Sequence, residues 1–297
     1  MEHLQPTSWA EALALRAERP EALPVAGGTD VMVELNFDRA RPPALLDLSR
    51  IPELTGWDRD AGSIRLGAAE PYARIVGGLA RPLPGLAMAA RTIGSPQIRN
   101  RGSVGGNLGS ASPAGDAHPP LLAGGATVEA ASVRGTRTIP VEDFFTGVKR
   151  NALEPDELIA AVRVPVARGP QQFAKIGTRN AMVIAVCSFA VAIDLDARTV
   201  GTGIGSAAPT PRRAGSAERF LAGELSAGGF WESRRTLPAS LTEKFGAHVG
   251  AAAVPIDDVR GTAAYRRHAL AVIARRTLTW AWAELGKENR GCGCHAM

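Results

Sequence analysis

The alternation of apolar and polar residues along this chain predicts short strands mixed with helices. Apolar runs of strand length lie at residues 22–26, 45–48, 126–132 and 158–165, and a hairpin is indicated at 54–67. A first helix is predicted where Thr7 or Ser8 can cap an amphipathic stretch, with Glu11 three residues after Ser8. Further helices are predicted where proline opens a segment, at residues 71–79, 82–91 and 119–123.

The second part of the chain places strands first and helices afterwards. Strands are predicted at residues 172–176, 183–194 and 200–206, with a tight turn at 196–198. A long helix is predicted over residues 261–285, with His268 and Leu270 on its apolar face and Arg266 on the opposite, solvent-facing side. Residues 167–170 separate the two parts and are predicted to be a linker.

Two glycine segments carry the strongest chemical signal. The first comprises Ala26, Gly27, Gly28, Thr29 and Asp30, and the second comprises Ser103, Val104, Gly105, Gly106 and Asn107. Paired glycines let the backbone approach a ligand closely and present several N–H groups to one anion. Because both segments also carry small hydroxyl, amide or carboxylate side chains, they predict a nucleotide cofactor with a diphosphate and a ribose-like chain.

Neither segment fits the common nucleotide-binding motifs. The chain has no G-x-x-x-x-G-K-S/T phosphate loop, and no G-x-G-x-x-G opens a helix after the first strand. The glycines at 201–205 look similar to the latter motif, but Pro209 and Pro211 follow and forbid a helix there. We therefore expect residues 201–205 to form a glycine-rich strand or turn.

Composition narrows the class of protein. The 297 residues are 45% hydrophobic and 21% charged, as in ordinary globular proteins, and the net charge of +5 comes from scattered arginines. With 5% aromatic residues there is little to stack on bases, so we expect no nucleic-acid partner. The longest apolar stretch, 181–193, is too short to span a membrane. The first residues do not have the pattern of a signal peptide, so a cytoplasmic location is expected.

The sequence gives little indication of a metal site or of a catalytic nucleophile. The histidines form no metal set, no G-x-S-x-G nucleophile motif is present, and the cysteines do not suggest a disulfide framework. Cys292-Gly293-Cys294-His295 is the one metal-like cluster, and we expect it to be unliganded because an iron–sulfur centre needs four ligands. The sequence thus supplies a cofactor cradle and no evident substrate catalyst.

Three charged residues outside the glycine segments are candidates for the same site. Asp116 follows Ser112 just after the second segment, so its carboxylate could bind a ribose or ribityl chain, although an exposed turn is the alternative. Lys175 and Arg179 open the second part of the chain, and a lysine near a flavin can stabilise negative charge on the reduced ring. A solvated strand end is the alternative for Lys175, and composition does not separate the two.

These segments resemble the FAD-binding (medium) subunit of molybdenum hydroxylases, the family of bacterial xanthine dehydrogenases and carbon monoxide dehydrogenases. The resemblance covers nearly the whole chain and includes both glycine segments, the stretch 111–116, residues 155–159, 173–179 and 258–267. It implies that Asp116 holds the ribityl side of the flavin, that Ile159 packs near the isoalloxazine and that Lys175 approaches the flavin.

The resemblance also implies an α+β fold and a division of labour between chains. We expect a two-lobed FAD-binding domain at residues 1–167, a smaller domain with a three-stranded sheet and helices at 171–286, and a flexible tail at 287–297. The implied partners are an iron–sulfur subunit and a molybdopterin subunit, assembled as a dimer of heterotrimers. Electrons would reach FAD from the iron–sulfur clusters and leave to NAD or another acceptor, with xanthine or hypoxanthine as the expected substrate of the complex.

Other interpretations remain open at this point. The complex could oxidise carbon monoxide or an aldehyde, or the chain could be a stand-alone FAD oxidoreductase or a scaffold that has lost its flavin. Two positions depart from the family pattern: Ile93 stands where some relatives carry an aromatic residue that stacks on the flavin, and Gly109 is smaller than usual. These departures leave the final electron acceptor open.

Overall fold

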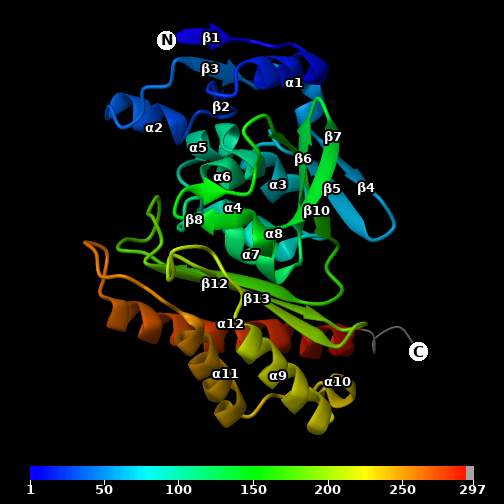
Figure 1. Ribbon diagram of the computed structural model, residues 1–297. Coiled ribbons are helices and arrows are strands. Elements are labelled where there is room, and N and C mark those ends of the chain that lie inside the picture. Colours follow the sequence, from blue (N-terminus) through cyan, green and yellow to red (C-terminus); the bar gives the residue numbers. More distant parts are fainter. Residues whose placement is uncertain (292–297) are drawn as a thin grey trace.

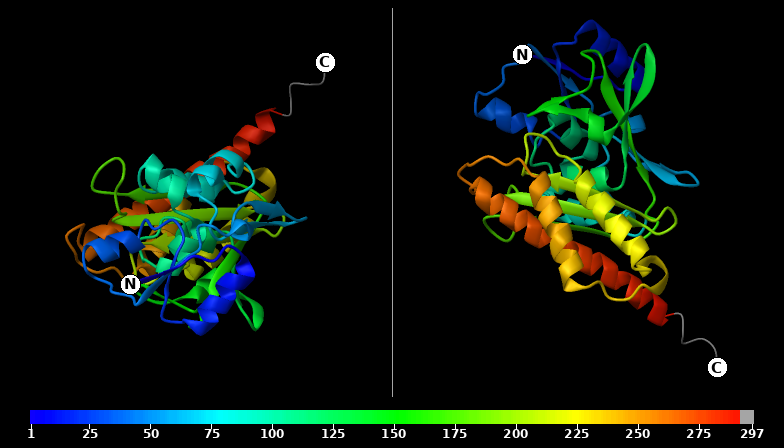
Figure 2. Two further views of the ribbon diagram at one scale, coloured as in Figure 1. Left: turned by 90° about the horizontal axis from the view of Figure 1, so that it is seen from above. Right: turned by 60° about the horizontal axis from the view of Figure 1, so that its bottom comes forward.

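The computed structural model describes residues 1–291, with side chains described through Leu285. The cluster at 292–295 lies outside the described residues. Figures 1 and 2 show three stacked parts, in which the first two precede residue 170 and the third follows it. No helix within residues 1–291 has the length and apolar content needed to cross a bilayer.

The first part is a small parallel sheet of order β1-β3-β2 flanked by two helices (Figure 1). Ser8 caps its first helix by accepting a hydrogen bond from the Glu11 N–H at 3.2 Å, as the sequence predicts. Its elements are β1 Glu2–Leu4, α1 Trp9–Glu18, β2 Leu23–Val25, α2 Val31–Asn36 and β3 Ala44–Asp47.

The second part is a five-stranded antiparallel sheet of order β4-β5-β10-β6-β7, with helices packed against it. Its strands are β4 Trp57–Arg59, β5 Ser63–Gly67, β6 Thr127–Ser132, β7 Gly135–Pro140 and β10 Leu158–Pro165. Its helices are η1 Pro52–Leu54, α3 Tyr72–Gly78, α4 Pro84–Thr92, α5 Pro96–Arg101, α6 Val104–Ser110, α7 His118–Ala123 and α8 Val141–Phe144. A small ribbon, β8 Phe145–Gly147 with β9 Arg150–Asn151, lies beside them.

The third part is the predicted three-stranded sheet, of order β11-β12-β13, covered by helices on the side away from the rest of the molecule (Figures 1 and 2). Its elements are β11 Gln171–Ile176, β12 Cys187–Asp194, β13 Thr199–Gly205, α9 Gly215–Ala227, α10 Phe230–Ser233, α11 Ala239–Ala252 and α12 Ala263–Gly291. The chain is thus a mixed α/β protein in which a smaller sheet-and-helix unit follows a two-lobed one.

Two apolar cores stabilise these units. One joins buried residues between Ala12 and Val164, and the other joins buried residues between Cys187 and Leu285. A small third cluster of Ala89, Ala123, Phe173 and Ala190 lies where α4 and α7 meet the third sheet. The sheet β11-β12-β13 is therefore covered on both faces, by helices of the second part and by its own helices.

Three local predictions need correction. The second glycine segment forms the N-cap and the first turn of α6 and is not a loop. Strand β12 begins at Cys187, whereas the sequence predicts a start at residue 183. On α12 the exposed side chain is His268, whereas Arg266 is 4% exposed. Arg266 is buried because its guanidinium donates to the carbonyl oxygens of Val186 and Ser206 and pairs with Asp258, so it joins the start of α12 to the sheet.

Candidate functional site

The fold brings the first glycine segment into direct contact with Arg101 and Gly102, the residues just before the second segment. A Cβ on Gly27 would lie 1.9 Å from the Arg101 carbonyl oxygen, so only glycine allows the first segment to pass this close to the end of α5. A Cβ on Gly102 would lie 3.5 Å from Thr29 Oγ1. Segments 74 residues apart, counted from Gly28 to Gly102, therefore meet at one place between the first two parts of the molecule.

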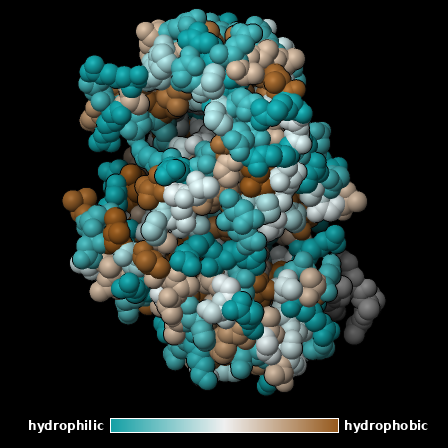
Figure 3. Space-filling view, in the orientation of Figure 1, coloured by the Kyte–Doolittle hydropathy of each residue, from teal (hydrophilic) through white to brown (hydrophobic). Residues whose placement is uncertain are grey.

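The first segment is a turn between β2 and α2 that leaves its amides available. Gly28 has φ +75°, a left-handed conformation that favours glycine. The backbone N–H groups of residues 27–30 donate no hydrogen bond to any acceptor within residues 1–291. Figure 3 shows the surface hollowed between α2 and the elements below it. Such a row of unpaired amides beside a hollow is a place where an anion can bind.

The sequence predicts that the amides of the second segment face a ligand. The amides of Gly105 and Gly106 instead donate hydrogen bonds within the protein. Ser103 caps α6 by accepting from the Gly106 N–H at 3.1 Å, and the Gly105 N–H donates to the Ala68 carbonyl oxygen at 3.0 Å. A Cβ on Gly105 would lie 2.5 Å from that oxygen. Glycine is thus required at 105 for the packing of α6, with Val104 buried beside it.

The Asn107 side chain is a polar group that the second segment leaves without a partner among the described residues. Its Oδ1 atom is buried and has no hydrogen-bond partner among the described residues. The Asn107 carbonyl oxygen lies 3.2 Å from His118 Nε2, and His118 is fully buried. Burial lowers the pKa of His118 to about 4, so the ring is neutral at physiological pH. The neutral imidazole of His118 thus contacts the backbone of Asn107.

Asp116 and Lys175 form a buried ion pair across the two halves of the chain. Lys175 Nζ lies 2.5 Å from Asp116 Oδ2, and their side chains are 10% and 9% exposed. The ammonium group also donates to the carbonyl oxygens of Thr92 at 2.9 Å and Val183 at 3.2 Å. The exposed turn and the solvated strand end considered from the sequence are therefore both wrong.

The electrostatics of this pair are set by burial. Burial raises the pKa of Asp116, while Lys175 and the Thr92 hydroxyl act in the opposite direction. The second carboxylate oxygen, Asp116 Oδ1, is buried and has no hydrogen-bond partner among the described residues. Since buried polar oxygens are nearly always paired, this atom is open to a hydrogen-bond donor from a ligand.

The other residues predicted from the sequence lie around this centre to different degrees. Ile159 on β10 is buried, and its Cδ1 would lie 3.9 Å from a Cβ on Gly109 of α6. The Ser112 hydroxyl accepts from the Ala114 N–H at 3.3 Å in the turn that leads to Asp116. Ile93 follows Thr92 at the end of α4. Arg179 is exposed and binds the carbonyl oxygens of Ala181 and Met182, so the structure does not bring it to Asp116.

Sequence reasoning missed three residues at this centre. Thr92 contacts Lys175 and Asp116, His118 supports Asn107, and Tyr72 is buried behind the second segment. Nothing in the sequence near Thr92 signals a contact with a lysine 83 residues away. Tyr72 had one available signal, because it is one of only two tyrosines in the chain.

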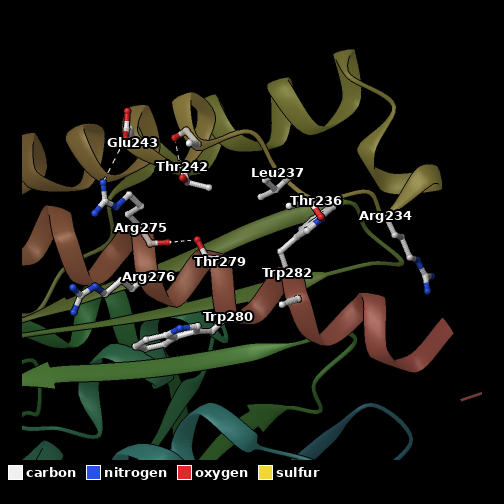
Figure 4. A pocket seen from close by; sticks show the side chains of 12 residues that line it. Arg234, Thr236, Leu237, Thr242, Glu243, Arg275, Arg276, Thr279, Trp280 and Trp282 are labelled. Atoms are coloured by element: carbon white, nitrogen blue, oxygen red, sulfur yellow. Dashed lines mark hydrogen bonds and ion pairs between the residues drawn. The ribbon is translucent and has the colours of Figure 1, made fainter. Parts of the chain in front are cut away.

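A cavity with a volume of about 460 Å³ lies elsewhere, between α11 and α12 (Figure 4). Its polar groups are largely paired within the chain: Arg275 lies 3.5 Å from Glu243, and the hydroxyls of Thr242 and Thr279 donate to backbone carbonyl oxygens. None of the residues that line this cavity has a buried side-chain oxygen without a partner, in contrast to Asn107 and Asp116. The glycine segments therefore define the better candidate.

Comparison with known proteins shows which protein family this chain resembles. Residues 1–167 match the family model described as FAD binding domain in molybdopterin dehydrogenase, and residues 172–281 match the CO dehydrogenase flavoprotein C-terminal domain. The nicotine 6-hydroxylase medium subunit of Paenarthrobacter nicotinovorans is 32% identical over 95% of this chain and 97% of its own. A putative xanthine dehydrogenase FAD-binding subunit of Escherichia coli is 34% identical over 71% of this chain and 75% of its own.

A solved structure agrees over nearly the full length. A chain of the carbon monoxide dehydrogenase from Hydrogenophaga pseudoflava superposes with a TM-score of 0.86 and 29% identity, covering 95% of this chain and 97% of the other. The sequence comparisons and the structural superposition thus indicate the same family.

Proposed function

The chain belongs to the family of FAD-binding medium subunits of molybdenum hydroxylases, and we propose that it relays electrons from iron–sulfur clusters on a partner chain to NAD or another acceptor. FAD is its cofactor, as the family match and the FAD-subunit relatives indicate. We also propose the domain boundaries 1–167 and 171–286, since one apolar core ends at Val164 and the other begins at Cys187.

The convergence of open polar groups carries this proposal. The unpaired amides belong to residues 27–30 of the first glycine segment, and the unpaired buried oxygens belong to Asn107 of the second segment and to Asp116, which follows it. A ligand with a diphosphate, a polyhydroxyl chain and a ring fits this combination. The residues present therefore suit FAD.

Each group has a separate task in the proposed site. The amides of residues 27–30, with the side chains of Thr29 and Asp30, would bind the diphosphate end, and Asn107 and Asp116 would accept hydrogen bonds from the polyhydroxyl chain. Ile159 would exclude water from the ring, and Lys175 would hold positive charge next to it. When bound, FAD supplies the ability to exchange both single electrons and electron pairs.

Lys175 is suited to this task because it is held by three acceptors and is hardly exposed. An ammonium group fixed in a site with little water interacts more strongly with negative charge than one in solution. Its ion pair with Asp116 also joins β11 to the turn before α7, so the position of the charge depends on how the two halves of the chain pack.

We propose xanthine or hypoxanthine oxidation as the overall reaction, carried out at a molybdopterin centre on another chain in the cytoplasm. Two of the xanthine dehydrogenase FAD-binding subunits related to this chain are 34% identical to it. Relatives named for nicotine and carbon monoxide are 32% and 31% identical, so these substrates are the alternatives. We further propose a dimer of heterotrimers as the assembled form.

The division of labour gives the decisive experiment. The isolated, FAD-loaded chain should stay oxidised when mixed with xanthine, nicotine or carbon monoxide under anaerobic conditions, and it should be reduced when the partner chains are added. In the complex, Asp116→Ala should weaken FAD binding by about 1–3 kcal/mol, the scale for leaving buried polar groups unpaired. Substrate should still reduce the iron–sulfur centres of that variant. Turnover by the isolated chain would instead favour a stand-alone flavoenzyme.

A further inference from the structure

Tyr72 lies directly behind the second glycine segment. It is the first residue of α3, its side chain is 2% exposed, and its N–H donates to the Gly102 carbonyl oxygen at 3.0 Å. Its ring carbon Cδ2 would lie 3.6 Å from a Cβ on Gly102. The ring is therefore fixed against the place where the two glycine segments meet.

The hydroxyl group of this ring has no hydrogen-bond partner among the described residues, although it is fully buried. Leaving a buried hydroxyl unpaired is unfavourable, and such groups in folded proteins are nearly always paired with protein, water or a ligand. The hydroxyl thus retains an unused donor in the region where the cofactor is expected.

Burial and two carboxylates keep this hydroxyl group protonated. The pKa of Tyr72 is raised well above its ordinary value by burial and by the negative charges of Asp116 and Asp30. Asp30 belongs to the first glycine segment and Asp116 follows the second, so both sides of the site act on this one group. Neither carboxylate accepts a hydrogen bond from it. The phenol consequently stays neutral and keeps its proton for another acceptor.

We propose that the Tyr72 hydroxyl donates a hydrogen bond to an oxygen of the diphosphate–ribityl stretch of FAD and positions that stretch beside the glycine segments. The proposal rests on the function proposed above. Binding of the cofactor beside the segments would give the hydroxyl the acceptor that the described residues do not supply. Tyr72 would then be a positioning residue of the cofactor site.

The small number of tyrosines allows a direct test on the wild-type chain. Because Tyr72 and Tyr265 are the only tyrosines, a protein labelled with ¹³C at the tyrosine ring carbon Cζ should give two resonances. Tyr265 is 48% exposed at the start of α12 and serves as an internal reference. FAD added to the flavin-free protein should shift the Tyr72 resonance and leave that of Tyr265 in place. ADP and riboflavin added separately would show which half of the cofactor is responsible.

The matched variants Tyr72→Phe and Tyr265→Phe give the second measurement. Loss of one hydrogen bond to FAD should raise the Kd of Tyr72→Phe about tenfold, whereas Tyr265→Phe should bind as the wild type does. The flavin-free Tyr72→Phe protein should be at least as stable as the wild type, since it loses an unpaired buried hydroxyl.

Two results would overturn this inference: a Tyr72 resonance that FAD does not move, or equal FAD affinity of the wild type and Tyr72→Phe. The second result is what a hydroxyl paired only with an internal water would give. If the wild-type chain itself binds no FAD, the proposed function fails first, and the two failures are thereby distinguishable.

Discussion

The chain contains two glycine-rich stretches that look alike in sequence but differ in what they do, residues 26–30 and residues 201–205. In the first, the amides of residues 27–30 have no acceptor among residues 1–291, and Gly28 adopts φ +75°. In the second, β13 pairs along its length with β12, and its outward amides at Thr202 and Ile204 donate to Glu218 and Arg212. One stretch is open to a ligand and the other is fully used by the fold.

The glycines of β13 serve packing instead. A Cβ on Gly201 would lie 2.0 Å from the Ala123 carbonyl oxygen, and one on Gly203 would lie 2.0 Å from that of Pro119. Helix α7 can rest on the strand only because these side chains are missing. Glycine content therefore marks a close approach, and the hydrogen bonding of the amides decides whether a ligand or another segment of the chain approaches.

The largest expected effect concerns Lys175, which β11 carries from the packed half of the molecule into the open site. Lys175→Met leaves the Asp116 carboxylate buried without its cation, and removing one partner of a buried pair costs about 3–5 kcal/mol. Urea unfolding of the flavin-free protein at neutral pH measures this loss. Because burial raises the pKa of Asp116, the loss should shrink as acid protonates the carboxylate.

The double variant Lys175→Met/Asp116→Asn is the control for this prediction. It removes the charge as well as its partner, so it should recover most of the lost stability. A single variant as stable as the wild type would mean that the pair contributes nothing to joining the two halves.

The next effect tests the open stretch. Gly28→Val should lower FAD affinity by about 100-fold, since it removes the turn that presents several amides, each worth about 1.5–3 kcal/mol toward a charged group. Titration of the flavin-free protein with FAD measures the change. The would-be Cβ of Gly28 meets only ordinary contacts, the nearest being Met32 at 3.5 Å, so the fold should survive.

Gly56→Val is the matched control, because Gly56 has φ +82° and its Cβ would meet nothing within 4 Å. Both variants carry the same backbone strain, and only Gly28→Val should lose the cofactor. Equal FAD affinity of the two would show that the first glycine stretch has been assigned the wrong role.

A glycine substitution in residues 201–205 should instead lower stability and leave FAD affinity nearly unchanged. Gly203→Ala places a methyl group against the Pro119 carbonyl oxygen and should lower the free energy of unfolding by about 1–3 kcal/mol, the usual cost of overpacking. Its FAD affinity should change far less than that of Gly28→Val. Gly223→Ala on α9 is the control, since its Cβ would meet nothing within 4 Å and alanine favours a helix. Loss of FAD without loss of stability in Gly203→Ala would erase the contrast.

The smallest effect comes from His118, which supports the second glycine segment. Its pKa is lowered to about 4, whereas the unfolded chain takes up this proton near the ordinary value of 6.5. Between these values the unfolded state binds more protons, so stability falls as the pH falls. From pH 7.5 to pH 5.5 this group should account for about 1 kcal/mol of lost stability. His118→Leu should lack that part of the pH dependence, while exposed His268→Leu should retain it.

Much of this account could be predicted from the sequence, for local reasons. The Ser8 cap, the strands around residues 44–47 and 158–165 and the non-ligand role of residues 201–205 all follow from short-range patterns. The two glycine segments and Asp116 were recognisable because glycine pairs with polar neighbours are uncommon.

What the sequence did not predict depends on distant contacts. Glycines are poor helix formers, yet Val104–Ser110 is helical because Ser103 caps it and Ala68 accepts from Gly105. The burial of Arg266 depends on the carbonyl oxygens of Val186 and Ser206, which are 80 and 60 residues away. The pairing of Lys175 with Asp116 likewise appears only when the two halves are packed.

Hydrogen–deuterium exchange with and without FAD tests the central contrast most directly. In the flavin-free protein the amides of residues 27–30 should exchange rapidly, because they have no acceptor, whereas those of residues 201–205 should be protected by β12, Glu218 and Arg212. FAD should slow exchange at 27–30 strongly and leave 201–205 nearly unchanged. Unaltered exchange at 27–30 in the FAD-saturated protein would contradict the assignment of this stretch to the cofactor site.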